Sequence, residues 1–171
     1  MKSKEYFYKL DEMFYHYFDL YLNKDLAGRQ FDLYGYCRMD NEKYIATRSV
    51  KIWEFIDYEH VMVKISDKFL IDNFSKNFLD KLVEELVNPH SNHHQSYLTL
   101  VSIVNAEVNK ENINWINKFK YSKSFLFGIR GWCDIRLIVV DIISDFIYTN
   151  QAGEKIVESY LHGNLKRYKK R

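Results

Sequence analysis

Hydrophobic spacing near the start of the chain predicts an amphipathic helix over residues 5–22. Apolar and aromatic side chains recur there at intervals of three and four, which places them on one face of a helix. These side chains are Tyr6, Leu10, Met13, Phe14, Tyr17, Phe18 and Tyr21. A polar connection follows at 23–30, where Gly28 can take a positive φ.

The hydrophobic period changes to two after this connection, which predicts a three-strand antiparallel meander. Residues 31–39 alternate between two faces, and residues 43–55 are rich in β-branched and aromatic side chains. A third alternating segment is centred on Val63. Turn-forming residues at 40–42 and 57–59 are expected to separate the three strands.

The second half of the chain predicts two helices and two covered strands. A helical period runs through residues 67–87, with Pro89 just beyond its end, and Asn109 is placed to cap a shorter helix. Residues 97–104 and 134–141 are nearly all apolar, which is typical of strands covered on both faces. A strand, a helix and another buried strand form a crossover that nearly always closes right-handed with parallel strands.

The predicted fold class is α+β, a single domain built on a mixed sheet of about five strands. Helices are expected on both faces, and the element order is αβββαβαβ. Residues 146–149 are expected to add an edge strand, and residues 154–161 a short helix. The globular domain is expected to span 1–165, followed by a mobile basic tail at 166–171, which holds five cations and no acid.

Composition supports a folded protein with one hydrophobic core region. The 171 residues are 47% hydrophobic and 17% aromatic, which excludes disordered and low-complexity classes. The longest apolar run, residues 135–143, is interrupted by Arg136 and Asp141, so no membrane partner is expected. The N-terminal segment lacks the continuous apolar region of a secretory signal, and the expected location is cytoplasmic.

Residue usage bears on origin and on redox chemistry. Lys, Asn, Ile, Tyr and Phe are abundant and Ala is rare, which indicates AT-rich codons and a bacterial or phage genome of low GC content. Cys37 and Cys133 are far apart and have no CxxC partner, so we expect two buried thiols rather than a disulfide framework or a zinc ribbon.

A histidine cluster at His90, His93 and His94 has two interpretations. Three imidazoles within five residues, with Glu84 or Glu85 upstream, could bind a transition metal. The spacing matches no structural zinc pattern, and adjacent imidazoles cannot easily both face one ion. A polar loop at a helix C-terminus, where histidine is favoured, is therefore the preferred interpretation, and no metal is assigned.

The most unusual stretch, residues 118–141, interleaves cations with aromatic side chains. Such a pattern suits contact with phosphates and stacking on bases, although the aromatic residues could simply belong to the core. The candidate binding residues are Lys118, Lys120, Lys123, Arg130, Trp132 and Arg136. The favoured hypothesis is a non-enzymatic binding or accessory domain without a cofactor that contacts nucleic acid or a protein partner.

The alternative hypothesis is a divergent metal-dependent nuclease. The predicted element order resembles the core of restriction-endonuclease-like enzymes, which use an acid-x-Lys on the third strand to hold Mg²⁺ and support the attacking water. Lys64 is present, but Met62 stands at the acid position. Asp57 and Glu59 precede it and could supply the carboxylates. No dinucleotide, P-loop, hydrolase-elbow or HExxH motif occurs in the sequence.

Several segments together resemble a family of small uncharacterised proteins from low-GC Gram-positive bacteria, known as a domain of unknown function. These segments are FDLYGYCRM, KYIATRSVKIWEF, VMVKISD, LVNPH, KFKYSKSFLFGIRGWCDIRLIVVD and YTNQAGEK. The resemblance covers about residues 5–160 and is most specific at 127–141. It implies a cytosolic, stand-alone bacterial domain, and it brings no activity, cofactor or site residue.

Overall fold

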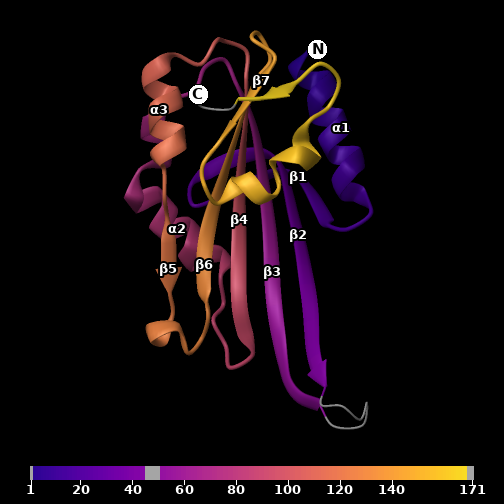
Figure 1. Ribbon diagram of the computed structural model, residues 1–171, viewed down its shortest axis with the longest axis vertical. Helices are drawn as coiled ribbons and strands as arrows, with labels where there is room; N and C mark the ends of the chain where they lie inside the picture. Colours follow the sequence, from indigo (N-terminus) through magenta and orange to yellow (C-terminus); the bar gives the residue numbers. More distant parts are fainter. Residues whose placement is uncertain (1, 45–50, 169–171) are drawn as a thin grey trace.

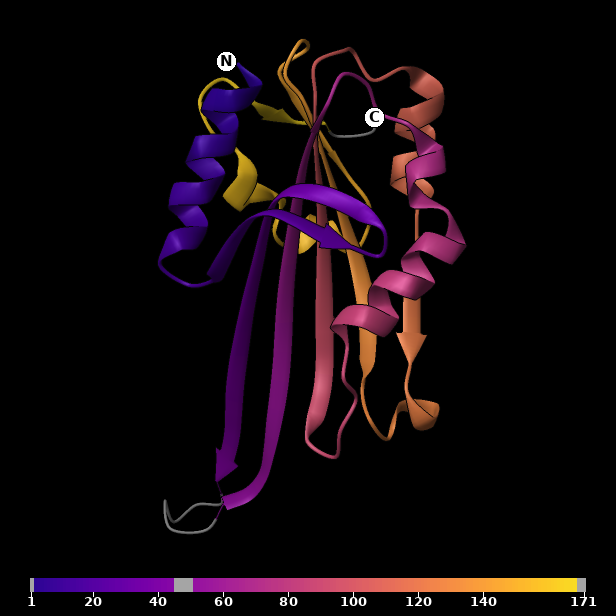
Figure 2. The same ribbon diagram turned by 180° about the vertical axis from the view of Figure 1, so that it is seen from behind.

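A mixed sheet with helices on both faces organises the part of the chain that the structure describes, residues 2–44 and 51–168. Figures 1 and 2 show this computed structural model from its two sides. The helices are α1 (Ser3–Tyr15), α2 (Lys76–Leu86) and α3 (Lys110–Lys118). The strands are β1 (Asp19–Leu26), β2 (Arg29–Tyr44), β3 (Lys51–Ser66), β4 (His93–Val104), β5 (Ser122–Ser124), β6 (Trp132–Asp141), β7 (Phe146–Thr149) and β8 (Lys166–Arg167). The predicted α+β class is confirmed, but the sheet has eight strands rather than about five.

The strand order is β1-β2-β3-β4-β6-β7-β8, and β5 pairs with β6. β1, β2 and β3 form an antiparallel meander, but its strands are not the predicted ones. All three predicted strands fall between the start of β2 and the end of β3, and β1 was not predicted as a strand. β4 and β6 are parallel and are joined through α3, which confirms the predicted crossover. β3 and β4 are also parallel, and α2 lies between them in sequence, so two consecutive crossovers build the centre of the sheet.

The first predicted helix is wrong beyond Tyr15. α1 ends there, and β1 begins at Asp19 within the segment that the helical period covers. Leu20 lies opposite Gly35 of β2, and the side chains of Phe18 and Leu20 occupy the space beside the Gly35 Cα. Pairing with a long neighbouring strand outweighs the helical spacing of this segment.

The two turns predicted at 40–42 and 57–59 are also wrong. Both segments lie inside one long hairpin of β2 and β3, in which Asp40 lies opposite Ile56. Polar side chains in an antiparallel strand can face solvent without ending it, so turn chemistry alone misplaces the boundaries here. Part of the predicted second strand, residues 45–50, lies outside the described residues.

Two other predicted helices differ in length or type. A 3-10 turn at Ile71–Phe74 precedes α2, so the helix predicted at 67–87 is shorter. The helix predicted at 154–161 is a pair of 3-10 turns, Gly153–Lys155 and Val157–Tyr160, whose backbone bonds span three residues. Within residues 2–44 and 51–168, no helix combines the length and apolar character needed to cross a bilayer.

The C-terminal segment continues the sheet. β7 forms at the predicted residues, but it is not an edge strand, because Lys166 and Arg167 pair with it as β8. Arg167 also forms ion pairs with Glu154 and Glu158. The tail predicted at 166–171 therefore starts with paired residues, and its last three residues lie outside the part that the structure describes. Its mobility stays a prediction.

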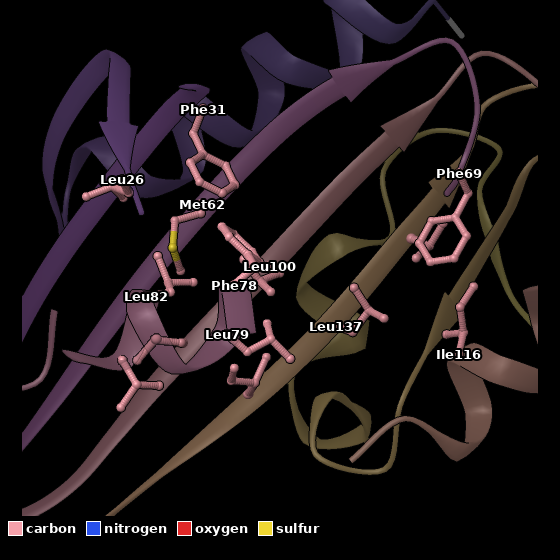
Figure 3. Close-up of a cluster of buried hydrophobic side chains, with 14 of the residues drawn as sticks. Leu26, Phe31, Met62, Phe69, Phe78, Leu79, Leu82, Leu100, Ile116 and Leu137 are labelled. Carbon is pink, nitrogen blue, oxygen red and sulfur yellow. The ribbon is translucent and has the colours of Figure 1, made fainter. Parts of the chain in front are cut away.

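Two hydrophobic cores lie on opposite faces of the sheet, because side chains in β3, β4 and β6 alternate between them. Figure 3 shows the core that α2 and α3 cover, which includes Leu26, Phe31, Met62, Phe78, Leu82, Leu100, Ile116 and Leu137. The core under α1 includes Tyr6, Leu10, Phe14, Val61, Val63, Val101, Ile138 and Tyr160. Burial on both faces explains the nearly continuous apolar sequence of β4 and β6.

The side chain of Asn150 completes one side of β6. β5 pairs with residues 132–134 and β7 with residues 138–141, which leaves a gap between the two short strands. Asn150 Oδ1 accepts a hydrogen bond from the Leu137 N–H at 2.9 Å, and its Nδ2 donates to the Ile135 carbonyl at 3.0 Å. The side-chain amide thus replaces a missing strand partner in a buried position.

Candidate functional site

Two of the three histidines in the sequence cluster lie in β4 rather than in the predicted loop. His93 is buried, with its Nδ1 2.6 Å from the Arg130 carbonyl oxygen and its Nε2 2.9 Å from Ser96 Oγ. The Nδ1 of His94 lies 2.8 Å from Asp57 Oδ1. The strand brings each imidazole to a different set of partners, which the loop interpretation did not anticipate.

His90 is the histidine that the loop prediction places correctly. Its Nε2 lies 2.9 Å from the Tyr58 hydroxyl, in the connection between α2 and β4. Among the residues that the structure describes, no group of three or more His, Cys, Asp or Glu side chains is placed to hold a metal ion.

The three residues of the nuclease hypothesis do not converge. Asp57 and Glu59 alternate in register with Val61, whose side chain belongs to the core under α1. Lys64 alternates with Met62 on the opposite face, where its Nζ lies 3.4 Å from Asp32 Oδ1. The sheet therefore stands between Lys64 and the two carboxylates proposed to hold Mg²⁺ with it.

The cations of the cationic-aromatic segment divide between several surroundings. Lys118 and Lys120 are exposed near the end of α3, and Lys123 lies 3.8 Å from the Glu84 carboxylate. Lys76, Lys120 and Lys123 line an open depression of ≈ 690 Å³, in which Asp80 and Glu84 offset two of the three positive charges. The small net charge that remains gives only a weak attraction for a polyanion.

Trp132 and Arg136 lie on the other face of the sheet from these lysines. Trp132 packs against His94 with ring centroids 5.0 Å apart. The buried Arg136 guanidinium lies 2.7 Å from Glu59 Oε1 and 3.5 Å from the centre of the Tyr97 ring. Burial raises the pKa of Glu59, and Arg136 opposes that shift. Arg136 therefore forms an ion pair inside the fold, and its guanidinium is not exposed for contact with a phosphate.

The two thiols differ in burial. Cys133 is fully buried, and burial raises its pKa to about 12, so it stays protonated and unreactive at neutral pH. Cys37 is only half-buried, although burial raises its pKa as well. Both are free thiols, and the expected burial is confirmed for Cys133 and wrong for Cys37.

A cavity of ≈ 370 Å³ lies on the face covered by α2. Its floor comes from β2, β3 and β4, and its wall from the 3-10 turn Ile71–Phe74 and the start of α2. The apolar lining includes Phe31, Met62, Phe74, Phe78 and Leu100, most of which Figure 3 labels. A cavity of this size with an apolar floor is typical of small-ligand sites.

Arg29 lies at the polar rim of this cavity. Its guanidinium carbon is 3.9 Å from the centre of the Phe78 ring, and its Nη1 donates a hydrogen bond to the Asn73 carbonyl. Burial lowers the pKa of Arg29. No carboxylate of the described residues forms an ion pair with it, so most of its donors remain for another acceptor.

The other charged residue of the rim is already paired. Lys64 contacts Asp32, and Asp32 Oδ2 also accepts a hydrogen bond from the Ile65 N–H at 2.7 Å. Ser66 and Ser102 add neutral polar groups to the rim. The lining is therefore apolar below and cationic above, and Arg29 is the cation of the rim that has no charged partner among the residues that the structure describes.

Sequence reasoning missed this cavity. Arg29 belongs to the polar connection 23–30, which carries no motif, and its distance from Phe78 along the chain hides their contact. The apolar face of α2 was visible in the helical period. The turn between β1 and β2 lies within the predicted connection at 23–30, and Gly28 has the expected positive φ of 77°. The position of Arg29 above that face was not predicted, because residues 19–22 were assigned to the helix rather than to β1.

Comparison with known proteins gives one family-level finding for this chain. A model of the family described as a domain of unknown function, DUF8052, matches residues 2–162. No curated protein and no solved structure matches the chain. The match supports the predicted resemblance to an uncharacterised family, and origin in low-GC Gram-positive bacteria stays a prediction.

Proposed function

Since the chain belongs to the DUF8052 family of domains of unknown function, we propose its function from its own geometry: it is a non-enzymatic binding domain for a small amphipathic anion. The ligand occupies the cavity between β3, β4 and α2. Its apolar part contacts the floor, and its charged group contacts Arg29 at the rim.

The position and pairing of the Arg29 guanidinium are the main observation behind this proposal. This guanidinium is partly exposed, lies against the Phe78 ring and has no carboxylate partner among the described residues, so its remaining donors are available to a bound anion. The planar fork of Arg suits a carboxylate or a phosphate in particular. Contact with the Phe78 ring fixes the guanidinium beside the apolar space rather than in open solvent.

The apolar floor sets the second requirement on the ligand. Met62, Phe78 and Leu100 are buried and leave a space of ≈ 370 Å³ above them. Filling such a space with hydrocarbon removes apolar surface from water, and this contributes about 25 cal/mol of favourable binding free energy per Å² of apolar surface buried. A medium-chain fatty acid is a small molecule that has both an apolar chain for the floor and a carboxylate for Arg29, so it is a suitable probe.

The test is a calorimetric titration of the full chain with octanoate and with octanol. We expect one saturable site for octanoate, and roughly tenfold weaker binding of octanol, because octanol lacks the charge that Arg29 recognises. Equal affinity for the two compounds would show an apolar cavity without anion recognition and would contradict the proposal.

Two variants locate the site. Arg29→Met should weaken octanoate binding by roughly tenfold to a hundredfold and leave octanol binding unchanged, since a hydrogen bond to a charged group is lost. Arg38→Met is the matched control, because Arg38 is exposed and pairs with Asp40. Ser102→Leu, at the rim, should weaken both ligands, whereas Ser91→Leu in an exposed turn should affect neither.

A further inference from the structure

An exposed apolar loop lies between β5 and β6. We call residues 125–131 the apical loop, which Figure 1 shows below β5 and β6, away from α1 and α3, with the β2–β3 hairpin reaching farther in the same direction. Phe127 is 101% exposed, Ile129 79% and Leu126 55%. Single exposed apolar side chains are ordinary, but three within four residues form a patch that calls for a partner.

The backbone holds these side chains outward in an unfavourable conformation. Leu126 and Phe127 have φ values of 48° and 53°, in the left-handed region that residues with large side chains rarely adopt. Hydrogen bonds across the loop fix this shape: the Phe125 N–H donates to the Gly131 carbonyl at 2.9 Å, and the Arg130 N–H to the Phe125 carbonyl at 3.1 Å. Strain of this kind persists where the surroundings enforce it and is concentrated at functional sites.

The base of the loop is anchored to β4. The Arg130 carbonyl oxygen lies 2.6 Å from His93 Nδ1, and the Phe125 ring packs against the His93 ring at 5.8 Å. Gly131 has a φ of 72° and abuts the His94 backbone so closely that no Cβ would fit. The apolar tip is therefore presented on a rigid base rather than on a flexible loop.

The loop itself carries one cation, Arg130, and no acid. Lys120 and Lys123 lie nearby in sequence, but they face the depression that also holds Asp80 and Glu84. Arg130 is exposed beside the apolar tip and forms no ion pair with any described side chain. Apolar side chains with an adjacent cation match the chemistry of an anionic lipid interface, where hydrocarbon lies just below phosphate.

The small area of the tip also favours a lipid partner over a protein. A specific protein interface buries about 800 Å² on each partner, far more than three side chains of one loop can supply. A convex tip needs a shaped groove on a protein, whereas a bilayer accommodates it without a complementary shape.

We propose that the apical loop docks this domain reversibly on anionic membranes, with Leu126, Phe127 and Ile129 in the interfacial region and Arg130 on lipid phosphate. The contact is at the surface and involves no spanning segment. It does not depend on the cavity or on its proposed ligand.

Cosedimentation of the full chain with excess vesicles tests the proposal. The vesicles are phosphatidylcholine alone, or phosphatidylcholine with one quarter phosphatidylglycerol. We expect at least fivefold greater binding to the anionic vesicles at low salt, and a decrease in that preference at 0.5 M NaCl because salt screens Arg130.

Phe127→Asn is the decisive variant. Asn tolerates a positive φ better than Phe, so the loop should keep its shape and the melting temperature should not fall. Vesicle binding should drop at least fivefold. Ile143→Asn is the matched control, since Ile143 is 57% exposed in the turn between β6 and β7 and should leave binding unchanged. Arg130→Gln should remove the preference for anionic vesicles.

Three outcomes would overturn the proposal. The first is that the parent and Phe127→Asn bind vesicles equally well. The second is that the parent binds neither vesicle type. The third is that the chain self-associates, that Phe127→Asn abolishes this self-association, and that no vesicle binding occurs. The last result would assign the tip to a contact between copies of the chain.

Discussion

Asn150 occupies a position in which both polar atoms of its side chain are used. It is 1% exposed, its Oδ1 accepts from the N–H groups of Leu137 and Gly153, and its Nδ2 donates to the carbonyls of Ile135 and Phe119. The sequence places this residue directly after the predicted strand at 146–149. It cannot show the bridging role, because the bonded groups of β6 lie 13 and 15 residues away.

Replacing Asn150 by Leu should therefore be severely destabilising. The substitution removes four hydrogen bonds and leaves buried backbone groups of β6 unsatisfied, so we expect the free energy of unfolding to fall by about 3 kcal/mol or more. Urea denaturation followed by circular dichroism measures the change. Asn114→Leu, at an exposed position of α3, is the control and should change stability by less than about 0.5 kcal/mol. A loss below about 1 kcal/mol in Asn150→Leu would contradict the bridging role.

His60 predicts how stability depends on pH. It is 3% exposed, and burial lowers its pKa to about 4. The unfolded chain takes up a proton near pH 6.5, whereas the folded chain does so only near pH 4, so stability is lost as pH falls through this interval. We expect His60→Gln to reduce the difference in unfolding free energy between pH 7 and pH 4 by about 3 kcal/mol.

Urea denaturation at several pH values between 7 and 4 checks this expectation. His93 and His162, whose pKa values burial also lowers, remain in the variant and keep part of the acid sensitivity. His16→Gln, at an exposed position, is the matched control. The same pH dependence in the parent and in His60→Gln would count against the assignment.

At the scale of elements, hydrophobic period predicts the long central elements, but it misses the edge strand β1 and the short strands β5 and β8. The parallel pair β4 and β6 and the helix between them were visible as two apolar runs around a capped helix. The boundary of α1 was not, because Phe18 and Tyr21 continue the helical spacing. In the structure they lie on opposite faces of the sheet, Phe18 against the core under α1 and Tyr21 stacked on Tyr34. Whether residues 19–22 form a helix or a strand depends on their pairing with β2, and the local sequence carries no information about that pairing.

β6 is predicted to be the most protected element in hydrogen exchange. It pairs with β4 on one side and with β5, Asn150 and β7 on the other, and residues 135–141 are all buried. Its amides should exchange only on global unfolding, roughly a thousandfold more slowly than those of the edge strand β1. Exchange measured by NMR or mass spectrometry at pH 7 gives the comparison, and similar rates in β1 and β6 would contradict the topology.

At the scale of the whole molecule, one sheet serves two cores and the cavity. The cavity draws its lining from the start of β2, from β3 and β4, and from the segment that enters α2. Each lining residue looks ordinary in sequence, since an apolar strand residue or a lone Arg has many possible surroundings. The site therefore follows from the arrangement of elements, and the sequence motifs that attracted attention, the histidines and the cationic stretch, do not form it.

Because the two cores share β6, the molecule should unfold in one transition. Leu137 lies in the core under α2 and α3, and Ile138 in the core under α1. Leu137→Ala and Ile138→Ala should each lower the free energy of unfolding by about 2–5 kcal/mol. In both variants the transitions followed by tryptophan fluorescence and by circular dichroism should coincide. Separate transitions in either variant would show that the faces unfold independently.

The alternation of side chains across the sheet also restricts how this chain can change in length. Deleting one residue inside β6 would exchange the faces of every residue on one side of the deletion. Where that side includes Arg136, its side chain would turn toward α2 and away from Glu59. An insertion in the connection between α2 and β4 changes no face. Among DUF8052 members we therefore expect gaps in alignments to fall between the central strands and not within them.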